Sequence, residues 1–212
     1  MFLDVTEIRN LSLGGRKYLA ALTDEFSSKK FPMFLKQKSE LIASTIKILE
    51  KIYVQYKTPV LKLRMDNAGE NLHFQHELNR NLVLRNVGTT IEYTAPYTPQ
   101  QNGKVERTFP TIFARTRANF NAAKFDLPTR KLLWAEGANC AFQLDNITVT
   151  RGRPHGPPYK VFTNKNPTYL HHLRTFGEVG ICKNHAYSSS PSNRGVSKHL
   201  CNRGKLGIFI HY

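Results

Sequence analysis

Three acidic residues, far apart in the sequence, have the types and positions that phosphoryl-transfer chemistry requires. Asp4 lies within a predicted first strand, Asp66 ends a predicted fourth strand, and Glu106 stands where a loop becomes a helix. Carboxylates gathered from adjacent strands and a nearby helix can hold two divalent cations about 4 Å apart, one activating a nucleophile and one stabilising the leaving oxygen. Each acid taken singly has an ordinary explanation, as a strand-end acid, a turn former or part of a solvated helix face. The hypothesis depends on all three occurring together.

The elements that must position these acids follow from the hydrophobic pattern. Strands are predicted over residues 2–6, 17–23, 31–36, 61–66 and 89–94, the first three as an antiparallel meander. Helical spacing predicts a helix that begins at Ser39 as its N-cap, and others over about 70–86, after the loop 95–103, and over about 132–147. This order predicts an α/β fold with a mixed five-stranded sheet flanked by helices, without choosing among such folds.

The last predicted helix contains the only tryptophan, and its expected buried face consists of Trp134, Ala138, Ala141, Phe142 and Leu144. The composition changes after it, because residues 151–158 are rich in proline and glycine and read as a linker. We therefore expect two units, a core over 1–150 and a linker with a small β-rich C-terminal extension over 151–212.

The charge of the chain indicates a polyanionic partner. Lys and Arg number 31 against 15 Asp and Glu, which gives a net charge of +16. A surface of this kind favours phosphate binding with release of counterions, and nucleic acid is the natural candidate. A merely well-solvated basic surface is the ordinary alternative. An anionic membrane fits less well, since the basic residues are scattered rather than gathered on one amphipathic segment.

Other function classes receive no support from the composition. No apolar run reaches the length of a membrane span, and no signal peptide is recognisable, so we expect an intracellular protein. Three cysteines without a C-x-x-C motif argue against a disulfide framework. A second group of residues has side chains of the types that bind zinc, but their spacing matches no compact zinc finger. The group consists of His171, His172, Cys182, His185 and Cys201.

An ordered set of short motifs, which spans nearly the whole chain, resembles the integrases of copia-type (Ty1/copia) retrotransposons, relatives of retroviral integrases. Any one motif alone is weak evidence, whereas the consistent order is strong. The motifs are Phe2–Val5, Arg16–Leu19, Thr23–Ser27, Leu35–Glu40, Leu63–Glu70, Tyr97–Arg107, Trp134–Ala138, Asn166–Pro167, His172–Gly177 and Gly207–Tyr212.

The resemblance implies a ribonuclease H-like integrase catalytic core whose D, D, E triad falls on Asp4, Asp66 and Glu106. It further implies a two-metal site for Mg²⁺ or Mn²⁺, strand transfer of element DNA ends into target DNA, homo-oligomers, and action in the nucleus. Asp24 matches a recurrent acid at the end of the second strand, and we interpret it as structural. Glu70 starts a helix, where the positive end of the helix dipole favours a carboxylate, and is left outside the site.

Residues around the third acid are the predicted DNA contacts. The loop before Glu106 offers hydrogen-bond donors, and basic residues that follow it could contact phosphates, although helix solubility is the alternative for each of them. The predicted DNA-binding residues are Gln100, Gln101, Asn102, Lys104, Arg107, Arg115 and Arg117.

Pro110 is the most serious departure from the family pattern. Within a helix begun at Asn102, its ring would clash with the carbonyl of Glu106, so either the helix kinks or it starts after that acid. Both alternatives threaten the metal geometry, and we expect impaired catalysis, as in a truncated or decayed copy. The main alternative function is a non-catalytic basic DNA-binding remnant. A second is a ribonuclease H for RNA–DNA hybrids with Glu40 or Glu50 as an extra acid, which the Gln-Asn-Gly loop disfavours.

Overall fold

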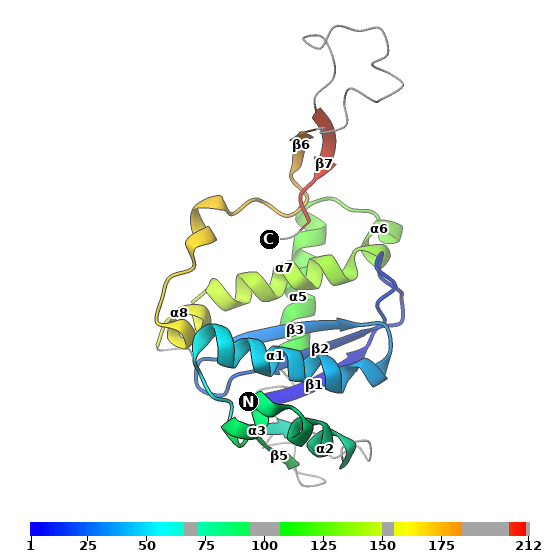
Figure 1. The fold of residues 1–212 in the computed structure, drawn as a ribbon. Coiled ribbons are helices and arrows are strands. Elements are labelled where there is room, and N and C mark those ends of the chain that lie inside the picture. The colour runs from blue at the N-terminus through cyan, green and yellow to red at the C-terminus, as the bar shows by residue number, and fades with distance from the viewer. Residues whose placement is uncertain (66–71, 94–106, 150–154, 184–203, 211–212) are drawn as a thin grey trace, which may run out of the picture.

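A mixed five-stranded sheet forms the centre of the computed structural model, which describes residues 1–65, 72–93, 107–149, 155–183 and 204–210 (Figure 1). The strand order is β3-β2-β1-β4-β5. β1 pairs antiparallel with β2, as β2 does with β3, whereas β1–β4 and β4–β5 are parallel pairs. The strands are β1 (Phe2–Glu7), β2 (Tyr18–Thr23), β3 (Lys30–Leu35), β4 (Lys62–Met65) and β5 (Thr90–Tyr93). The predicted strands and meander are therefore confirmed.

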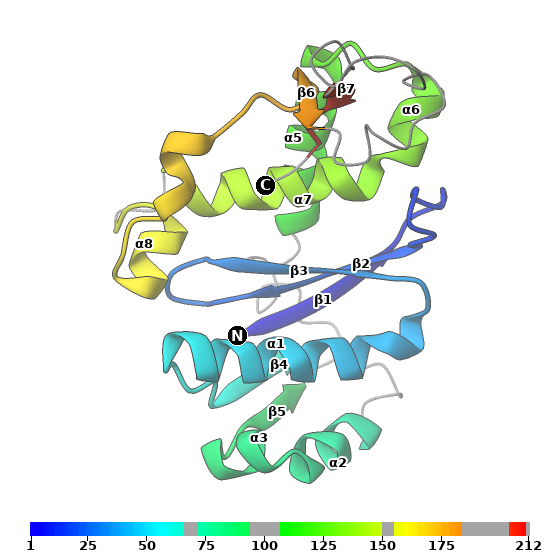
Figure 2. The ribbon, with the colours of Figure 1, turned by 45° about the horizontal axis from the view of Figure 1, so that its top comes forward.

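One face of the sheet is covered by α1 (Leu41–Tyr56), α2 (Leu72–Arg80) and α3 (Leu82–Val87), as Figure 2 shows. Alternation along β1 sends Leu3 and Val5 to this side, where the buried core includes Leu22, Leu49, Leu63 and Phe74. Burial of such apolar surface is the main force that holds a helical layer on a sheet.

Two helix boundaries differ from the prediction. The predicted N-cap at Ser39 is wrong, because a 3₁₀ turn, Lys38–Glu40, precedes α1 and makes Glu40 the N-cap residue. The Glu40 carboxylate accepts a hydrogen bond from the Lys36 backbone N–H (3.0 Å). The single helix predicted over 70–86 is two helices, since Asn81 separates α2 from α3 and accepts a bond from the Leu84 N–H (3.1 Å). Asparagine is a strong N-cap residue, and this role outweighed the continuous apolar pattern.

The opposite face is covered by α5 (Thr108–Ala122) and α7 (Trp134–Ile147), with the short α6 (Leu127–Leu132) before α7. Trp134, Ala138, Ala141 and Phe142 are buried as predicted, and Leu144 is partly buried. The sequence analysis missed α6. Its signals were an Asp126 N-cap, which accepts a bond from the Thr129 N–H (3.0 Å), and a proline in the first turn.

Pro110 lies in the first turn of α5, which begins at Thr108. The first amide groups of a helix have no partner within it, so a proline there removes no hydrogen bond. The earliest bond of α5 runs from the Thr111 N–H to the Arg107 carbonyl (3.3 Å). The described helix thus begins two residues after position 106, in line with the alternative of a later helix start; Glu106 itself lies outside the described residues, so the choice between the two alternatives stays a prediction.

Gly137 lets α5 and α7 approach closely. A Cβ atom at this position would lie 2.7 Å from Phe120 Cζ and 2.9 Å from Thr116 Cγ2. We expect Gly137→Ala to lower the free energy of unfolding by up to about 2 kcal/mol, because overpacking outweighs the better helix propensity of alanine. Urea unfolding measures this loss. The smaller side chain in Phe120→Leu should recover part of it, and additive losses in the double variant would contradict a steric cause.

The C-terminal region combines elements that pack on the core with a separate hairpin. α8 (Pro158–Thr163) contributes Phe162 to the α1-side core, and Phe176 packs with buried Phe120 and Cys140. A 3₁₀ turn, η2 (Thr168–His172), lies between them. β6 (Val179–Lys183) and β7 (Gly204–Ile208) form a two-stranded antiparallel hairpin that projects beyond α7 (Figure 1).

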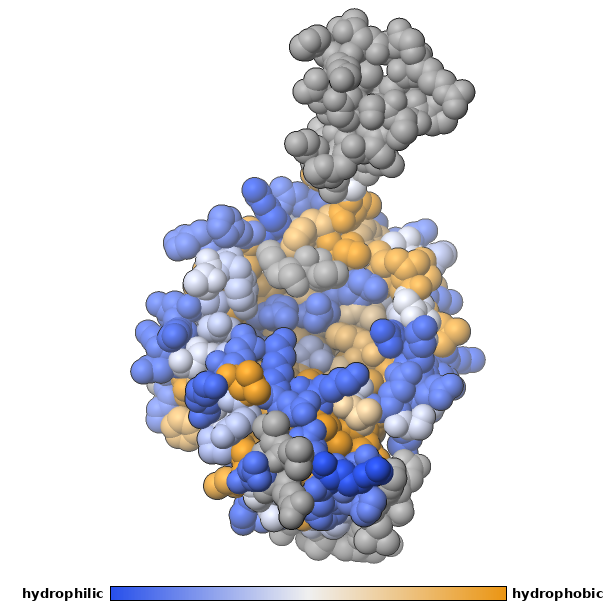
Figure 3. All heavy atoms as spheres, in the orientation of Figure 1, coloured by the Kyte–Doolittle hydropathy of each residue, from blue (hydrophilic) through white to orange (hydrophobic). Residues whose placement is uncertain are grey.

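The surface agrees with the composition. Hydrophilic side chains dominate the face seen in Figure 3, and hydrophobic side chains gather near α6, where Leu127 and Leu132 are exposed. None of the helices in the described ranges is long and apolar enough to cross a membrane.

Candidate active site

Asp4 lies at the middle of the central strand β1, on the face of the sheet that α5 and α7 cover. Its partner in the antiparallel register is Ala21, and directly opposed residues point their side chains to the same face. Ala21 belongs to the buried cluster of that face. The Asp4 side chain is partly buried, and its Oδ1 accepts a hydrogen bond from the Val5 backbone N–H (2.8 Å).

The start of α5 packs beside this position. Phe109 and Ile112, both in the first turns of α5, share the buried cluster with Ala21. The N-terminus of α5 therefore meets the sheet on the face that carries Asp4. This approach requires the small Ala21 side chain, because a larger one would hold the helix away from the strand.

The other two predicted triad members, Asp66 and Glu106, lie outside the described residues. The elements next to them are described: Asp66 follows Met65, the last residue of β4, and Glu106 precedes Arg107, the N-cap of α5. β4 pairs in parallel with β1 through Leu3↔Met65. Among the described side chains, no group of three His, Cys, Asp or Glu could hold a metal ion. That search did not include Asp66 and Glu106, so the triad stays a prediction.

Three acids that the sequence analysis left outside the triad, Asp24, Glu40 and Glu50, have structural partners, whereas Glu70 lies outside the described residues. The Asp24 carboxylate accepts bonds from the Ser27 backbone N–H (2.8 Å) and hydroxyl (2.7 Å), and so shapes the β2–β3 turn. Glu50 accepts a bond from the Asn81 side chain (2.6 Å), which ties α1 to the α2–α3 junction. Both Glu40 and Glu50 belong to the α1 layer, on the other side of the sheet from Asp4.

Three of the predicted DNA contacts lie in the described part of the chain. Arg107, at the start of α5, and Arg117 are exposed. Arg115 is less exposed, and its Nη2 lies 3.1 Å from Asp145 Oδ1. An ion pair therefore gives Arg115 a structural role, while DNA contact remains a prediction for all three. Gln100, Gln101, Asn102 and Lys104 lie outside the described residues.

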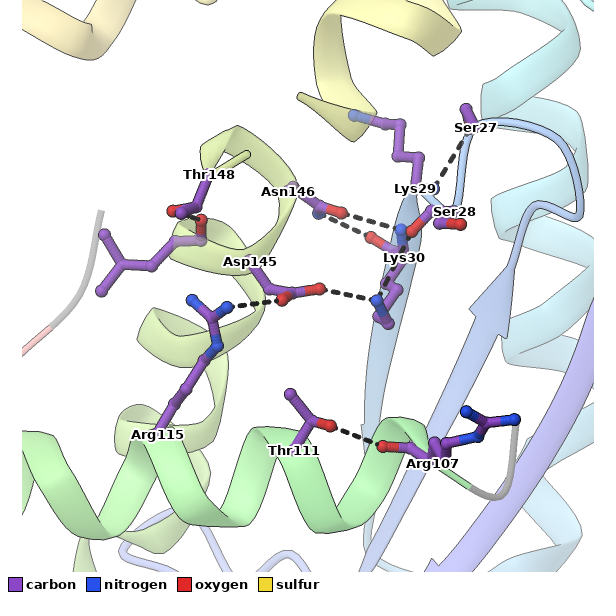
Figure 4. Close-up of polar contacts among 11 residues, drawn as sticks. Ser27, Ser28, Lys29, Lys30, Arg107, Thr111, Arg115, Asp145, Asn146 and Thr148 are labelled. Atoms are coloured by element: carbon purple, nitrogen blue, oxygen red, sulfur yellow. Dashed lines mark hydrogen bonds and ion pairs between the residues drawn. The ribbon is translucent and has the colours of Figure 1, made fainter. Parts of the chain in front are cut away.

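Asp145, which the sequence analysis missed, is the centre of a buried ion-pair cluster (Figure 4). Its side chain is 1% exposed, and its Oδ2 lies 2.6 Å from Lys30 Nζ. With Arg115 on the other carboxylate oxygen, the cluster joins α7, β3 and α5. No sequence signal distinguished this acid from the solvated face of a helix, because both of its partners are far away in the chain.

The next residue, Asn146, binds the backbone of the same strand. Its Oδ1 accepts a bond from the Lys30 N–H (2.8 Å), and its Nδ2 donates to the Lys30 carbonyl (2.8 Å). One side-chain amide thus satisfies both outward backbone groups of Lys30 at the start of β3 (Figure 4). Buried backbone groups need such partners.

Comparison with known proteins supplies the family. No family model matches the chain. It is 32% identical over 166 residues to the retrovirus-related Pol polyprotein from transposon TNT 1-94 of Nicotiana tabacum. The match covers 78% of this chain and 12% of that polyprotein, so the chain spans only a small part of its relative.

Solved integrase structures share the fold. The catalytic core domain of HTLV-2 integrase in complex with magnesium has a TM-score of 0.51 at 18% identity, over 76% of this chain and 93% of that one. A chain of the simian T-cell lymphotropic virus intasome with a PP2A regulatory subunit has a TM-score of 0.55 at 14% identity. The match covers 97% of this chain and 66% of that one. The catalytic core domain of BIV integrase has a TM-score of 0.50 at 18% identity, over 77% of this chain and 92% of that one. The fold is therefore ribonuclease H-like, as predicted. Together with the Pol polyprotein relative, it identifies the chain as a copia-type retrotransposon integrase core of the retroviral integrase superfamily.

Proposed function

We propose that this chain catalyses metal-dependent DNA strand transfer, with Asp4, Asp66 and Glu106 as the metal-holding triad. The observation that carries the proposal is the position of Asp4, which lies on the α5 face of the sheet beside the parallel partner strand β4.

The neighbouring elements support convergence of the three acids. Alternation along β4 sends Met65 into the α1-side core, so an extended residue directly after it would point to the face of Asp4. Asp66 is that next residue. Glu106 comes three residues before Phe109, which packs with the Ala21 partner of Asp4. The ends of β4 and α5 next to these two acids thus support a triad on the Asp4 face of the sheet.

The donor set fits Mg²⁺ or Mn²⁺, because these hard cations prefer carboxylate oxygens. The HTLV-2 core is a structure with magnesium, which supports the same choice here. Bound metal would polarise the target phosphodiester and favour the deprotonated form of the attacking 3′-hydroxyl. The chain's own contribution is to hold three oxygen donors on a rigid strand, its neighbour and a helix start, and to neutralise DNA phosphates.

DNA is the proposed partner. The net charge of +16 and the exposed Arg107 and Arg117 of the α5 region support contacts to the phosphate backbone of DNA. The HTLV-2 core was solved in trimeric and dimeric forms, and the simian virus chain is part of an intasome. By this likeness we propose that the chain works as a homo-oligomer on element ends and target DNA in the nucleus. We also propose residues 1–150 as the catalytic unit and 151–212 as an extension anchored by Phe162 and Phe176.

The ribonuclease H alternative is less well supported than strand transfer. It required Glu40 or Glu50 as an additional acid beside the triad. Both lie in the α1 layer and are held by hydrogen bonds of their own, across the sheet from Asp4.

Calorimetric titration with Mn²⁺ tests the proposal against a non-catalytic DNA-binding remnant. We expect Asp4→Asn to weaken Mn²⁺ affinity at least about tenfold, because it removes a negative ligand from the cluster. Glu7→Gln is the matched control: Glu7 lies on the same strand but is exposed and pairs with Lys17 (2.8 Å). Absence of Mn²⁺ binding to the unaltered chain, or equal affinity in Asp4→Asn, would favour the remnant.

A further inference from the structure

A cavity of about 450 Å³ lies along the outer edge of β3, between α1, α7, α8 and η2. Its lining is basic and rich in hydrogen-bond donors and contains no aspartate or glutamate. Three lysines, Lys29, Lys30 and Lys51, line it, together with side-chain amides such as Asn139 and Gln143 and three tyrosine rings. It is separate from the proposed triad, because β2 lies between β3 and the strand of Asp4.

Lys29 is the central feature of this cavity. The residue is 5% exposed, and its ammonium lies 4.1 Å from the centre of the Tyr159 ring and 5.2, 5.5 and 5.8 Å from those of Phe31, Tyr56 and Phe162. Within the described residues its Nζ makes no hydrogen bond or ion pair. Figure 4 shows the side chain pointing toward α8, away from Asp145.

The neighbouring lysine provides a comparison within the same strand. Lys30 is equally buried, at 6%, but its ammonium contacts the Asp145 carboxylate at 2.6 Å. Burying an ammonium is costly unless it is paired, and cation–π contacts offset only part of that cost. For Lys29 the cost shows in its pKa, which desolvation, together with the charge of Lys51, lowers to about 8. Among the described residues, Asp145 is the counter-ion of Lys30, and the cavity lining contains no carboxylate for Lys29.

We propose that this cavity binds a small oxyanion of the phosphate class, with Lys29 and Lys51 as its charged partners. Such a ligand would supply the missing negative charge, and the amides and tyrosine hydroxyls of the lining could donate to its oxygens. Backbone phosphates of duplex DNA are the wrong shape for the site, because an ammonium that is 5% exposed lies too deep for the surface of a double helix. The phosphate is therefore free in solution or a terminal monoester of a larger molecule.

Calorimetric titration with inorganic phosphate tests the site, and a 5′-phosphorylated dinucleotide beside its unphosphorylated form distinguishes the two sources. We expect phosphate to bind, and Lys29→Met to weaken it at least about tenfold while keeping the apolar stem that packs on the rings. Lys51→Gln should cause a smaller loss, since Lys51 is exposed. Lys47→Gln, one turn away on the same helix and outside the cavity, should leave the affinity unchanged.

Sulfate extends the test, because its charge is constant above neutral pH. Its affinity should fall as pH rises through about 8, where Lys29 loses its proton. Burial raises the pKa of both Tyr56 and Tyr169, so these hydroxyls stay neutral over that range. Thermal unfolding with and without about 10 mM phosphate confirms that each variant is folded and gives a second readout of binding. No heat and no thermal shift with the unaltered chain, or equal affinity in Lys29→Met, would overturn the proposal.

Discussion

Strand transfer by the chain carrying Asp66→Asn should fall at least about a thousandfold below that of the unaltered chain, and Glu106→Gln should have an effect of the same size. Residues that act as one catalytic unit show such losses singly, and combined changes then add little. Asparagine and glutamine keep the side-chain shape but remove the negative charge that holds the metal. A gel-based assay of element-end joining to target DNA, with Mg²⁺ or Mn²⁺, measures the loss.

Glu70→Gln is the matched control. Glu70 lies in the same sequence motif as Asp66, but its predicted role is to stabilise the start of a helix rather than to bind metal. We expect its strand transfer to stay within a few fold of the unaltered chain. The Asp66→Asn, Glu106→Gln double variant should be no worse than either single one. Activity that persists in either single variant would remove that acid from the site, whereas loss in Glu70→Gln would show that the site extends beyond three acids.

Replacing Asp145 with alanine should lower the free energy of unfolding by about 3 to 5 kcal/mol. The change leaves the ammonium of Lys30, which is 6% exposed, without its carboxylate, and also removes the partner of Arg115. Removing one member of a buried ion pair lowers stability by more than the pair contributes in total, because the remaining charge stays desolvated and unpaired. Urea unfolding followed by circular dichroism measures the loss.

Replacement of the whole cluster separates this cause from a simple cavity. Asp145→Leu combined with Lys30→Met and Arg115→Met leaves no buried charge, and we expect it to recover most of the stability that Asp145→Ala loses. Asp126→Ala is a control of similar chemistry at an exposed helix N-cap, where we expect a loss several times smaller. A loss of that size in Asp145→Ala, or a triple variant as unstable as the single one, would contradict the assignment.

The sheet was predictable from sequence because each strand carries its own local pattern. The apolar alternation of β1 and β4 and the turn signals between β1, β2 and β3 need no knowledge of distant residues. Helix ends were less predictable. Ser39 has the right residue type for a cap, yet Glu40 takes that position, and Asn81 divides a continuous pattern into α2 and α3.

The functional residues divide in the same way. Asp4 could be proposed from its place in a strand and from the family motifs, whereas Asp145 could not. Its importance comes from Lys30, which precedes it by 115 residues, and from the burial of both side chains. Lys29 likewise looks like any surface lysine until α8 brings Tyr159 and Phe162 over it.

The amide of Asn146 also limits how copies of this integrase core can assemble. β3 is an outer strand of the sheet, and another chain could extend the sheet only by pairing with its free backbone groups. Asn146 already occupies those of Lys30, and Pro32, two residues further on, has no N–H to offer. A second chain that paired with β3 would therefore find the backbone groups of Lys30 already bonded and no N–H at Pro32, which disfavours extension of the sheet at this edge.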